Sequence, residues 1–159
     1  MSSKPRLTVK TGDWATLASL ALPLRLRVFV HEQAVPLEME VDEWDPMALH
    51  AVVLGESGEA FATGRLVFEQ PGCVSKSTPS SLGNAVGRIG RVAVLATDRG
   101  QGLGRLVMVT LIQTANEKGI KRLTLHAQQS AVGFYERFGF FSVGEAFEEA
   151  GIAHIEMWR

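Results

Sequence analysis

The stretch Asp98-Arg99-Gly100-Gln101-Gly102-Leu103-Gly104 lies between a sequence typical of a β-strand and a sequence typical of an α-helix. Alternating and β-branched residues predict the strand over residues 86–95. The helix continues to Lys118, and Gly119 is expected to end it because glycine readily takes the left-handed conformation of a helix C-terminus. A strand, a glycine-rich turn and a helix therefore follow one another directly, and this unit decides the fold.

Glycine is concentrated in this part of the chain. Six of the 16 glycines fall between Gly83 and Gly104, so the backbone there must adopt conformations that other residues disfavour. Such a turn builds an anion site, because the N–H groups at a helix N-terminus lack partners and the helix dipole adds partial positive charge. Arg99 and Arg105 flank the turn and can add charge-assisted contacts. A helix cap without a ligand is the alternative, and the glycines alone do not decide between the two.

Two familiar phosphate-binding motifs are absent from the glycine-rich stretch. A P-loop needs GxxxxGK followed by Ser or Thr, and the sequence contains no such string. The dinucleotide fingerprint GxGxxG also fails, because Arg105 stands where its third glycine would be. A nucleotide-binding module is therefore disfavoured.

The order of the remaining elements predicts an α/β chain with a mixed sheet and helices on both of its faces. A helix capped by Asp13 is expected from Trp14 towards Val30, with a break at Pro23. Gly87 and Gly90 interrupt the strand at 86–95 and predict a bulge. Further strands are expected at 7–10, 48–54, 60–68, 122–127, 140–143 and 152–158, a hairpin turn at 55–58, an exposed loop at 70–83 and a short helix at 131–137.

Length and composition favour one globular domain over residues 1–159. The chain is 46% hydrophobic and 21% charged, which excludes a disordered protein. Its 16 Lys and Arg against 17 Asp and Glu give a net charge of −1, so no strong overall field for nucleic acid is expected. The single cysteine, Cys73, suits a reduced compartment. No run of about 20 apolar residues and no signal peptide is recognised, so we expect a cytoplasmic protein without a membrane span.

Three segments resemble the signatures of the GNAT N-acetyltransferase superfamily. Arg99-Gly100-Gln101-Gly102-Leu103-Gly104 is similar to its (Q/R)xxGx(G/A) pyrophosphate loop. Arg91-Val92-Ala93-Val94 resembles the strand whose backbone pairs with the pantetheine arm of acetyl-CoA. The third segment begins at Gln128 and ends at Phe140, and it resembles NxxAxxFYxxxGF with glutamine in place of the asparagine. Glutamine can make the same hydrogen bonds from one methylene further out.

Two further strings resemble the ElaA-like branch of this superfamily: Arg25-Leu26-Arg27-Val28-Phe29-Val30-His31-Glu32-Gln33 and Phe147-Glu148-Glu149-Ala150-Gly151-Ile152-Ala153-His154-Ile155. The resemblance implies the GNAT fold, a mixed and mostly antiparallel sheet flanked by helices on both faces, and it implies acetyl-CoA as cosubstrate. The residues that it implies in binding acetyl-CoA are Val92, Ala93, Val94, Arg99, Gly100, Gln101, Gly102, Leu103, Gly104, Arg105, Gln128, Ala131 and Phe134.

Tyr135 is the only tyrosine, and it stands where the resemblance implies a general acid. A phenol with a pKa of about 10 is protonated at neutral pH and can donate to a thiolate whose parent pKa is about 8.5. Without the resemblance, a core tyrosine is the favoured interpretation. The backbone N–H of Val94 is the candidate donor to the oxyanion, provided that the bulge near Gly90 splays the strand.

The sequence does not identify the group that removes the proton from the acceptor amine. An alkylammonium has a pKa of about 10, so some group or water chain must remove its proton. His154 is the histidine that we favour for the acceptor side, with a purely structural histidine as the alternative. The acidic residues at 38–45 could attract a cationic amine, but we favour a solvated loop there. Trp44 in this loop either lines the acceptor pocket or packs against neighbouring side chains. The candidate bases are Glu32, Glu38, Glu40, Asp42, His31, His50, His126, Glu145, Glu148 and His154.

We therefore expect an N-acetyltransferase that moves an acetyl group from acetyl-CoA to a primary amine of a small molecule or peptide. Direct transfer in a ternary complex is expected, because a ping-pong route needs an acylated nucleophile and Cys73 lies in the wrong place. The four histidines lack paired spacing, so no metal site is expected. A catalytically silent acyl-CoA-binding module that senses or recruits is the alternative. The resemblance to this family also leaves open whether the chain forms a homodimer.

Overall fold

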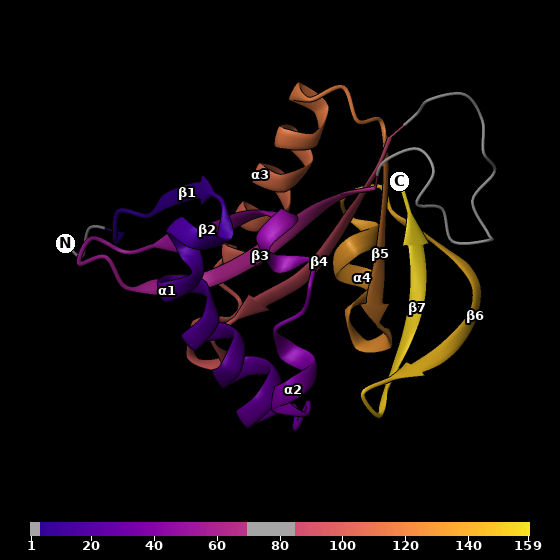
Figure 1. The fold of residues 1–159 in the computed structure, drawn as a ribbon, viewed down its shortest axis with the longest axis horizontal. Helices are drawn as coiled ribbons and strands as arrows, with labels where there is room; N and C mark the ends of the chain where they lie inside the picture. Colours follow the sequence, from indigo (N-terminus) through magenta and orange to yellow (C-terminus); the bar gives the residue numbers. More distant parts are fainter. Residues whose placement is uncertain (1–3, 70–84) are drawn as a thin grey trace.

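The computed structural model describes residues 4–69 and 85–159. The loop expected at 70–83, and Cys73 within it, lie outside the described residues. Figure 1 shows the arrangement of the elements. In chain order the elements are β1 (Thr8–Gly12), α1 (Trp14–Arg25), the π-helix η1 (Leu26–Glu32), α2 (Leu37–Glu40), the 3₁₀ turn η2 (Asp45–Met47), β2 (Leu49–Leu54), β3 (Ala60–Glu69), β4 (Val86–Val94), η3 (Ala96–Asp98), α3 (Leu103–Glu117), β5 (Arg122–Gln128), η4 (Gln129–Ala131), α4 (Val132–Glu136), β6 (Phe141–Glu149) and β7 (Ile152–Trp158).

The seven strands form one sheet in the order β1-β2-β3-β4-β5-β7-β6. Only the β4–β5 pair is parallel, and each of the other five neighbouring pairs is antiparallel. The expected hairpin at 55–58 joins β2 to β3, and Gly58 takes a positive φ of 83° in its turn. The prediction of a mixed, mostly antiparallel sheet is confirmed, and β6 is longer than expected.

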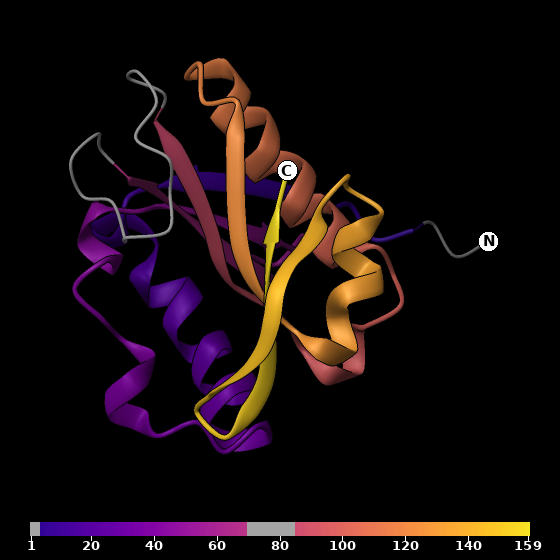
Figure 2. The same ribbon diagram turned by 90° about the vertical axis from the view of Figure 1, so that its right-hand side faces the viewer.

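Helices cover both faces of the sheet, with α1 on one face and α3 and α4 on the other (Figure 2). The apolar stripe of α3 packs on β2, β3 and β4, and forms the largest core cluster, with Val107, Met108 and Leu111 fully buried. On the opposite face, Leu17 and Ala21 of α1 bury against Val52 of β2. Within the described residues, no helix is long and apolar enough to span a membrane.

Strands β4 and β5 run together and then separate. They pair only from Val86 to Ile89. Beyond that point the β3–β4 register shifts beside Gly64, which faces both Arg91 and Val92. Arg91 takes a left-handed φ of 51°, a conformation seldom adopted by residues other than glycine. This bulge confirms the prediction from Gly87 and Gly90, and it leaves the last residues of β4 without a neighbour on the β5 side.

The break predicted at Pro23 is wrong, because α1 continues through Pro23 to Arg25. Proline removes the N–H that would bond to the carbonyl of Ser19, four residues earlier. Both residues are exposed, so water can satisfy that carbonyl and the ring meets no neighbour. The helix then changes to the seven-residue π-helix η1. As predicted, Asp13 caps α1, accepting a hydrogen bond from the N–H of Thr16 at 2.8 Å.

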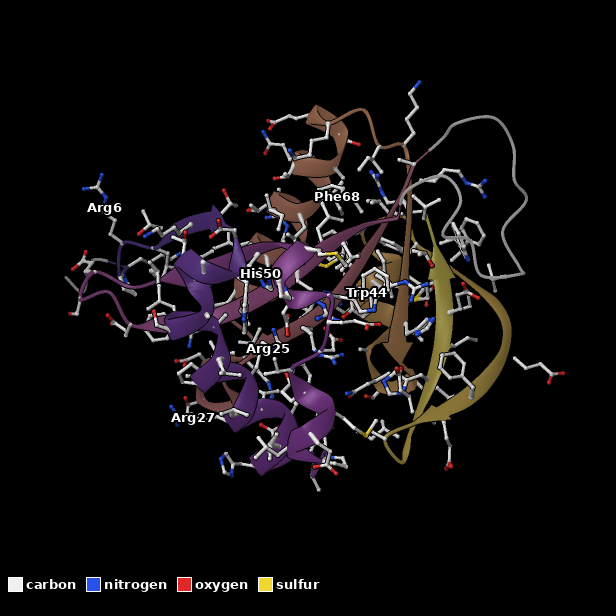
Figure 3. The ribbon with its side chains drawn as sticks, viewed as in Figure 1. Arg6, Arg25, Arg27, Trp44, His50 and Phe68 are labelled. Atoms are coloured by element: carbon white, nitrogen blue, oxygen red, sulfur yellow. The ribbon has the colours of Figure 1, made fainter. Side chains whose placement is uncertain are left out.

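The segment after η1 is not the solvated acidic loop that we favoured. Arg25 is 1% exposed and donates to the carboxylates of Glu40 (2.6 Å) and Asp45 (2.7 Å), which are themselves buried. Arg25 extends from α1 towards the middle of the molecule (Figure 3). A buried charge is stable only when it is paired and hydrogen-bonded, so the arginine and the two acids hold residues 37–45 against α1.

Two arginines of the sheet complete this cluster. Arg65 of β3 donates to Asp42 (2.6 Å) and Asp45 (2.9 Å), and Arg91 of the bulge donates to Asp42 (3.3 Å). Burial alone would raise the pKa of Asp45, but Arg25 and Arg65 hold that pKa below its usual value. Burial does raise the pKa of Glu40. We call this cluster the arginine–carboxylate network: Arg25, Arg65, Arg91, Glu40, Asp42 and Asp45.

We expect the substitution Asp45→Ala to lower the free energy of unfolding by about 3–5 kcal/mol, because Arg25 and Arg65 would then share only Glu40 and Asp42 and one buried positive charge would lose its compensation. Glu43→Ala is the control, since Glu43 is exposed in the same segment and should change stability by less than about 0.5 kcal/mol. Urea unfolding of both variants measures the difference. Equal midpoints would contradict the structural role assigned to Asp45.

Candidate functional site

A cavity of about 890 Å³ opens where β4 and β5 separate. One end is formed by residues 98–105, which we call the loop end, and the other by residues 149–154, which we call the hairpin end. Residues of η1 and α2 wall it on the α1 face of the sheet, and α4 lines it from the other side. Tyr135, His154 and the residues predicted to bind acetyl-CoA line this cavity, except Gln101, whose side chain is exposed.

The loop end has the backbone geometry that can accept an anion. Gly100 and Gly102 have φ values of +81° and +79°, which side-chain-bearing residues rarely adopt. Gly102 is the N-cap of α3 and provides no side-chain cap. The first N–H groups of this 15-residue helix therefore have no intrahelical acceptor. Their dipoles and the guanidinium groups of Arg99 and Arg105, both of which line the cavity, give this end a positive potential.

The backbone of β4 faces the cavity between the two ends. The N–H of Leu95 bonds to the carbonyl of Phe61 at 3.2 Å, and Val94 is the partner of Ala62. Hydrogen-bonded and non-bonded pairs alternate along antiparallel strands, so the N–H of Val94 points away from β3, into the gap left by β5. The carbonyl of Val94 also points away from β3 and accepts from Arg99 Nε at 3.1 Å.

Tyr135 of α4 lines the cavity beside the core of the α3 face. Its ring packs edge-on against Phe134 (5.1 Å between centroids) and Phe140 (6.4 Å). Burial raises the pKa of Tyr135 to about 12. The phenol therefore keeps its proton throughout the neutral range and can act as a donor there.

Two polar contacts tie η1 to the cavity. Gln128 of β5 donates its amide to Gln33 Oε1 at 2.8 Å, which links the strand to the residue that follows η1. At the loop end, Arg99 and Glu32 form an exposed ion pair at 2.8 Å. Exposed ion pairs contribute little stability. The pair with Glu32 therefore costs little to break, and the guanidinium of Arg99 can bind an anion in its place.

The hairpin end carries two histidines and one acid. His154 is 9% exposed, and its Nδ1 lies 2.7 Å from the carbonyl of Ile152. Because a carbonyl only accepts, Nδ1 carries the hydrogen, and the neutral ring keeps its lone pair on Nε2. Glu149 Oε2 lies 3.7 Å from His126 Nδ1. The neighbouring ring of His126 lowers the pKa of Glu149, although burial opposes the shift.

The structure places some of the candidate bases in the cavity and others outside it. Glu40, Asp42, His126 and His154 line the cavity, but the first two belong to the arginine–carboxylate network. His50 is buried elsewhere against the carbonyl of Asp45, and burial lowers its pKa. The cavity does not include Glu32, Glu38, His31, Glu145 or Glu148.

Sequence reasoning missed several cavity residues. Glu149 was not among the candidate bases, although it lies in the string that resembles the ElaA-like branch. The strand alternation of that string could have separated Glu149 from Glu148. Trp44 lines the cavity, as the first of its two interpretations expected. Arg65 and Arg88 also line it, and no local motif marks them, whereas Arg91 and Gln33 line it and lie in quoted strings without having been assigned a role.

The sole tyrosine allows a direct check of its environment. Absorbance titration should give Tyr135 a midpoint of about 12 in the folded protein, against about 10 in guanidinium chloride. Because the folded state holds the proton more tightly, stability should be unaffected by this group below about pH 10 and should fall as the pH rises from 10 to 12. A folded-state midpoint near 10 would show a hydrated phenol instead.

The chain is similar to known acyltransferases. A sequence model of the acetyltransferase (GNAT) domain matches residues 72–159, which is more than half of the chain. The Bacillus subtilis protein YjcF, named an uncharacterized N-acetyltransferase, is 31% identical over 140 residues, covering 87% of this chain and 89% of YjcF. The structure of an acyl-CoA N-acyltransferase from Pseudomonas aeruginosa is 32% identical, with a TM-score of 0.77 over 97% of this chain and 99% of that one.

Escherichia coli ElaA is also a structural relative. It is 28% identical and superposes with a TM-score of 0.76 over 97% of this chain and 99% of ElaA. This similarity agrees with the two strings that resemble the ElaA-like branch. The family match and the relatives above 30% identity together show that this chain belongs to the GNAT acetyltransferase family.

Proposed function

We propose that this protein transfers an acetyl group from acetyl-CoA to a primary amine, with donor and acceptor bound together. The observation that carries the proposal is one continuous cavity that joins an anion site at its loop end to titratable groups at its hairpin end. The P. aeruginosa relative is named an acyl-CoA N-acyltransferase. That name supports an acyl-CoA donor, and the acetyl group and the primary amine are the more specific parts of the proposal.

The loop end fits the pyrophosphate of acetyl-CoA. Gly100 and Gly102 have positive φ values, and a Cβ at either position would meet no atom within 4 Å. An anion can therefore approach the backbone N–H groups at the start of α3 without a side chain in the way. Arg99 and Arg105 add charge-assisted contacts. The pantetheine arm would then lie along Val92–Val94, in the gap where β4 has no strand partner.

Two groups are assigned to the transfer step. The N–H of Val94 donates to the carbonyl oxygen of the thioester as that oxygen gains negative charge. The amine nitrogen attacks the carbonyl carbon, a C–N bond forms, and the C–S bond breaks. Tyr135 gives its proton to the departing thiolate and recovers a proton from the amine nitrogen through solvent. Its raised pKa keeps that proton in place until the thiolate forms.

Acetyl-CoA binding tests the first part of the proposal. A saturating ligand at about 100 times its Kd stabilises a protein by about 2.7 kcal/mol, which should raise the Tm by several degrees. Gly102→Leu should abolish this shift, because the new side chain projects into the cavity at the loop end. Gly119→Leu is the matched control, since Gly119 has the same φ of +79° and the same open surroundings, at the far end of α3.

The Gly119 variant should lose intrinsic stability and still respond to acetyl-CoA. A normal response of the Gly102 variant would mean that the loop end does not hold the cofactor. No response of the unmodified protein to acetyl-CoA or CoA would overturn the proposed function.

Tyr135→Phe tests the general acid. We expect kcat to fall by about 100-fold, with the Kd of acetyl-CoA unchanged within about twofold, because only the hydroxyl is removed. The measurement is CoA release with the best amine from a screen, together with calorimetric titration of acetyl-CoA. An unchanged kcat would remove Tyr135 from the mechanism. Slow CoA release that no amine accelerates would favour a silent acyl-CoA-binding module.

A further inference from the structure

The hairpin end of the cavity brings together side chains from three neighbouring strands. His126 lies on β5, Glu149 at the end of β6 and His154 on β7, and all three line the cavity. Glu149 Oε2 and His126 Nδ1 are 3.7 Å apart. Both side chains are partly exposed, 48% for Glu149 and 33% for His126, so a ligand in the cavity can reach them.

The strand register explains why these side chains share a face. Gln128 is opposite His154, and His154 is opposite Phe147. Alternate residues of a strand point to the same side of the sheet, so Glu149 lies on the side of Phe147, whereas Glu148 lies on the opposite side. The cavity lining accordingly includes Glu149 and not Glu148.

The ring of Phe147 fixes both histidines. It packs edge-on against His126 with 5.0 Å between centroids, and it stacks on His154 at 6.1 Å and an interplanar angle of 23°. The His154 ring is held further by the Ile152 carbonyl at 2.7 Å. The two imidazoles are therefore held by packing against Phe147, with Glu149 beside the first of them.

The charge at the hairpin end is set by Glu149. The neighbouring ring of His126 lowers the pKa of Glu149, burial raises it, and the charge of Arg91 lowers it further. Arg91 is itself paired with Asp42 and Glu40 in the arginine–carboxylate network. That network contains three arginines and three acids, so it adds no net charge to the cavity. Arg88 also lines this cavity and adds a positive charge to its wall.

We propose that Glu149 binds the ammonium group of the acceptor and that His126 takes its proton, which makes the acceptor a cationic primary amine. This assignment rests on the proposed acetyl transfer. His126 is chosen over His154 because its ring lies beside the carboxylate that binds the ammonium group, with Nδ1 3.7 Å from Glu149 Oε2.

The proton balance is complete without a further reagent. The bound ammonium ion R–NH₃⁺ donates to Glu149, and one N–H bond breaks as its proton passes to the unprotonated ring nitrogen of His126. The neutral amine then has the lone pair with which it attacks the thioester carbon. His126 releases this proton to solvent through the open mouth of the cavity. The sum is R–NH₃⁺ plus acetyl-CoA giving the acetamide, CoA and one proton.

Glu149→Gln tests the assignment, with Glu148→Gln as the matched control on the opposite side of the same strand. The acceptor probes are n-butylamine, phenethylamine and spermidine, each with acetyl-CoA, followed by CoA release between pH 6 and pH 9. We expect kcat/KM for the best amine to fall by about 100-fold in Glu149→Gln, with the KM of acetyl-CoA unchanged. His126→Gln should lower kcat.

A second readout does not need turnover. The imidazole NMR signals of His126 and His154 are followed as n-butylammonium chloride is added to the acetyl-CoA-saturated protein, with potassium chloride as the ionic-strength control. We expect n-butylammonium to shift the His126 signal in the unmodified protein and in Glu148→Gln, and to leave it unshifted in Glu149→Gln.

The possible outcomes distinguish a failure of the proposed acetyl transfer from a failure of the roles given to Glu149 and His126. If acetyl-CoA binds but no amine is acetylated, the proposed function fails, and the NMR titration alone decides whether Glu149 binds an ammonium ion. If an amine is acetylated and Glu149→Gln behaves like Glu148→Gln in both rate and NMR response, the assignment of Glu149 and His126 is overturned and acetyl transfer stands.

Discussion

The site depends on the place where two parallel strands stop pairing. β4 and β5 hold together over four residue pairs and separate after Ile89 and Leu125. The bulge at Arg91 begins just beyond, and it turns the rest of β4 away from β5. Every later feature follows from this separation, because it leaves backbone N–H groups without a strand partner and opens the cavity through the sheet. A sheet without the bulge would close the gap with ladder hydrogen bonds.

The sequence predicted the backbone conformation of the loop end because the signals for it are local. Gly100 and Gly102 had to follow a strand and begin a helix, and the structure gives both the positive φ values that glycine permits. The bulge was also predictable, from glycines inside a strand pattern. These features depend on backbone conformation over a few neighbouring residues, and composition and spacing report such conformations directly.

The other side of the site depends on contacts between distant residues. Asp42 and Asp45 read as a solvated acidic loop, because the arginines that bury them lie 20 or more positions away in the sequence, at Arg25 and Arg65. Glu149 and His126 are likewise brought together by the register of β5, β6 and β7. The break predicted at Pro23 failed for a related reason, since exposure decides whether a helix tolerates the lost hydrogen bond. The single domain stays a prediction.

One wall of the cavity comes from a different part of the chain than the loop end and the hairpin end. The loop end and the β4 backbone lie within residues 72–159, the part that matches the family model. The wall formed by Gln33, Met39 and Trp44 lies outside that part. It is attached to the sheet mainly through the arginine–carboxylate network rather than through strand pairing. Residues 33–44 can therefore diverge between relatives while the loop end and the hairpin end stay unchanged, and the fold allows this wall of the cavity to evolve separately from the rest of its lining.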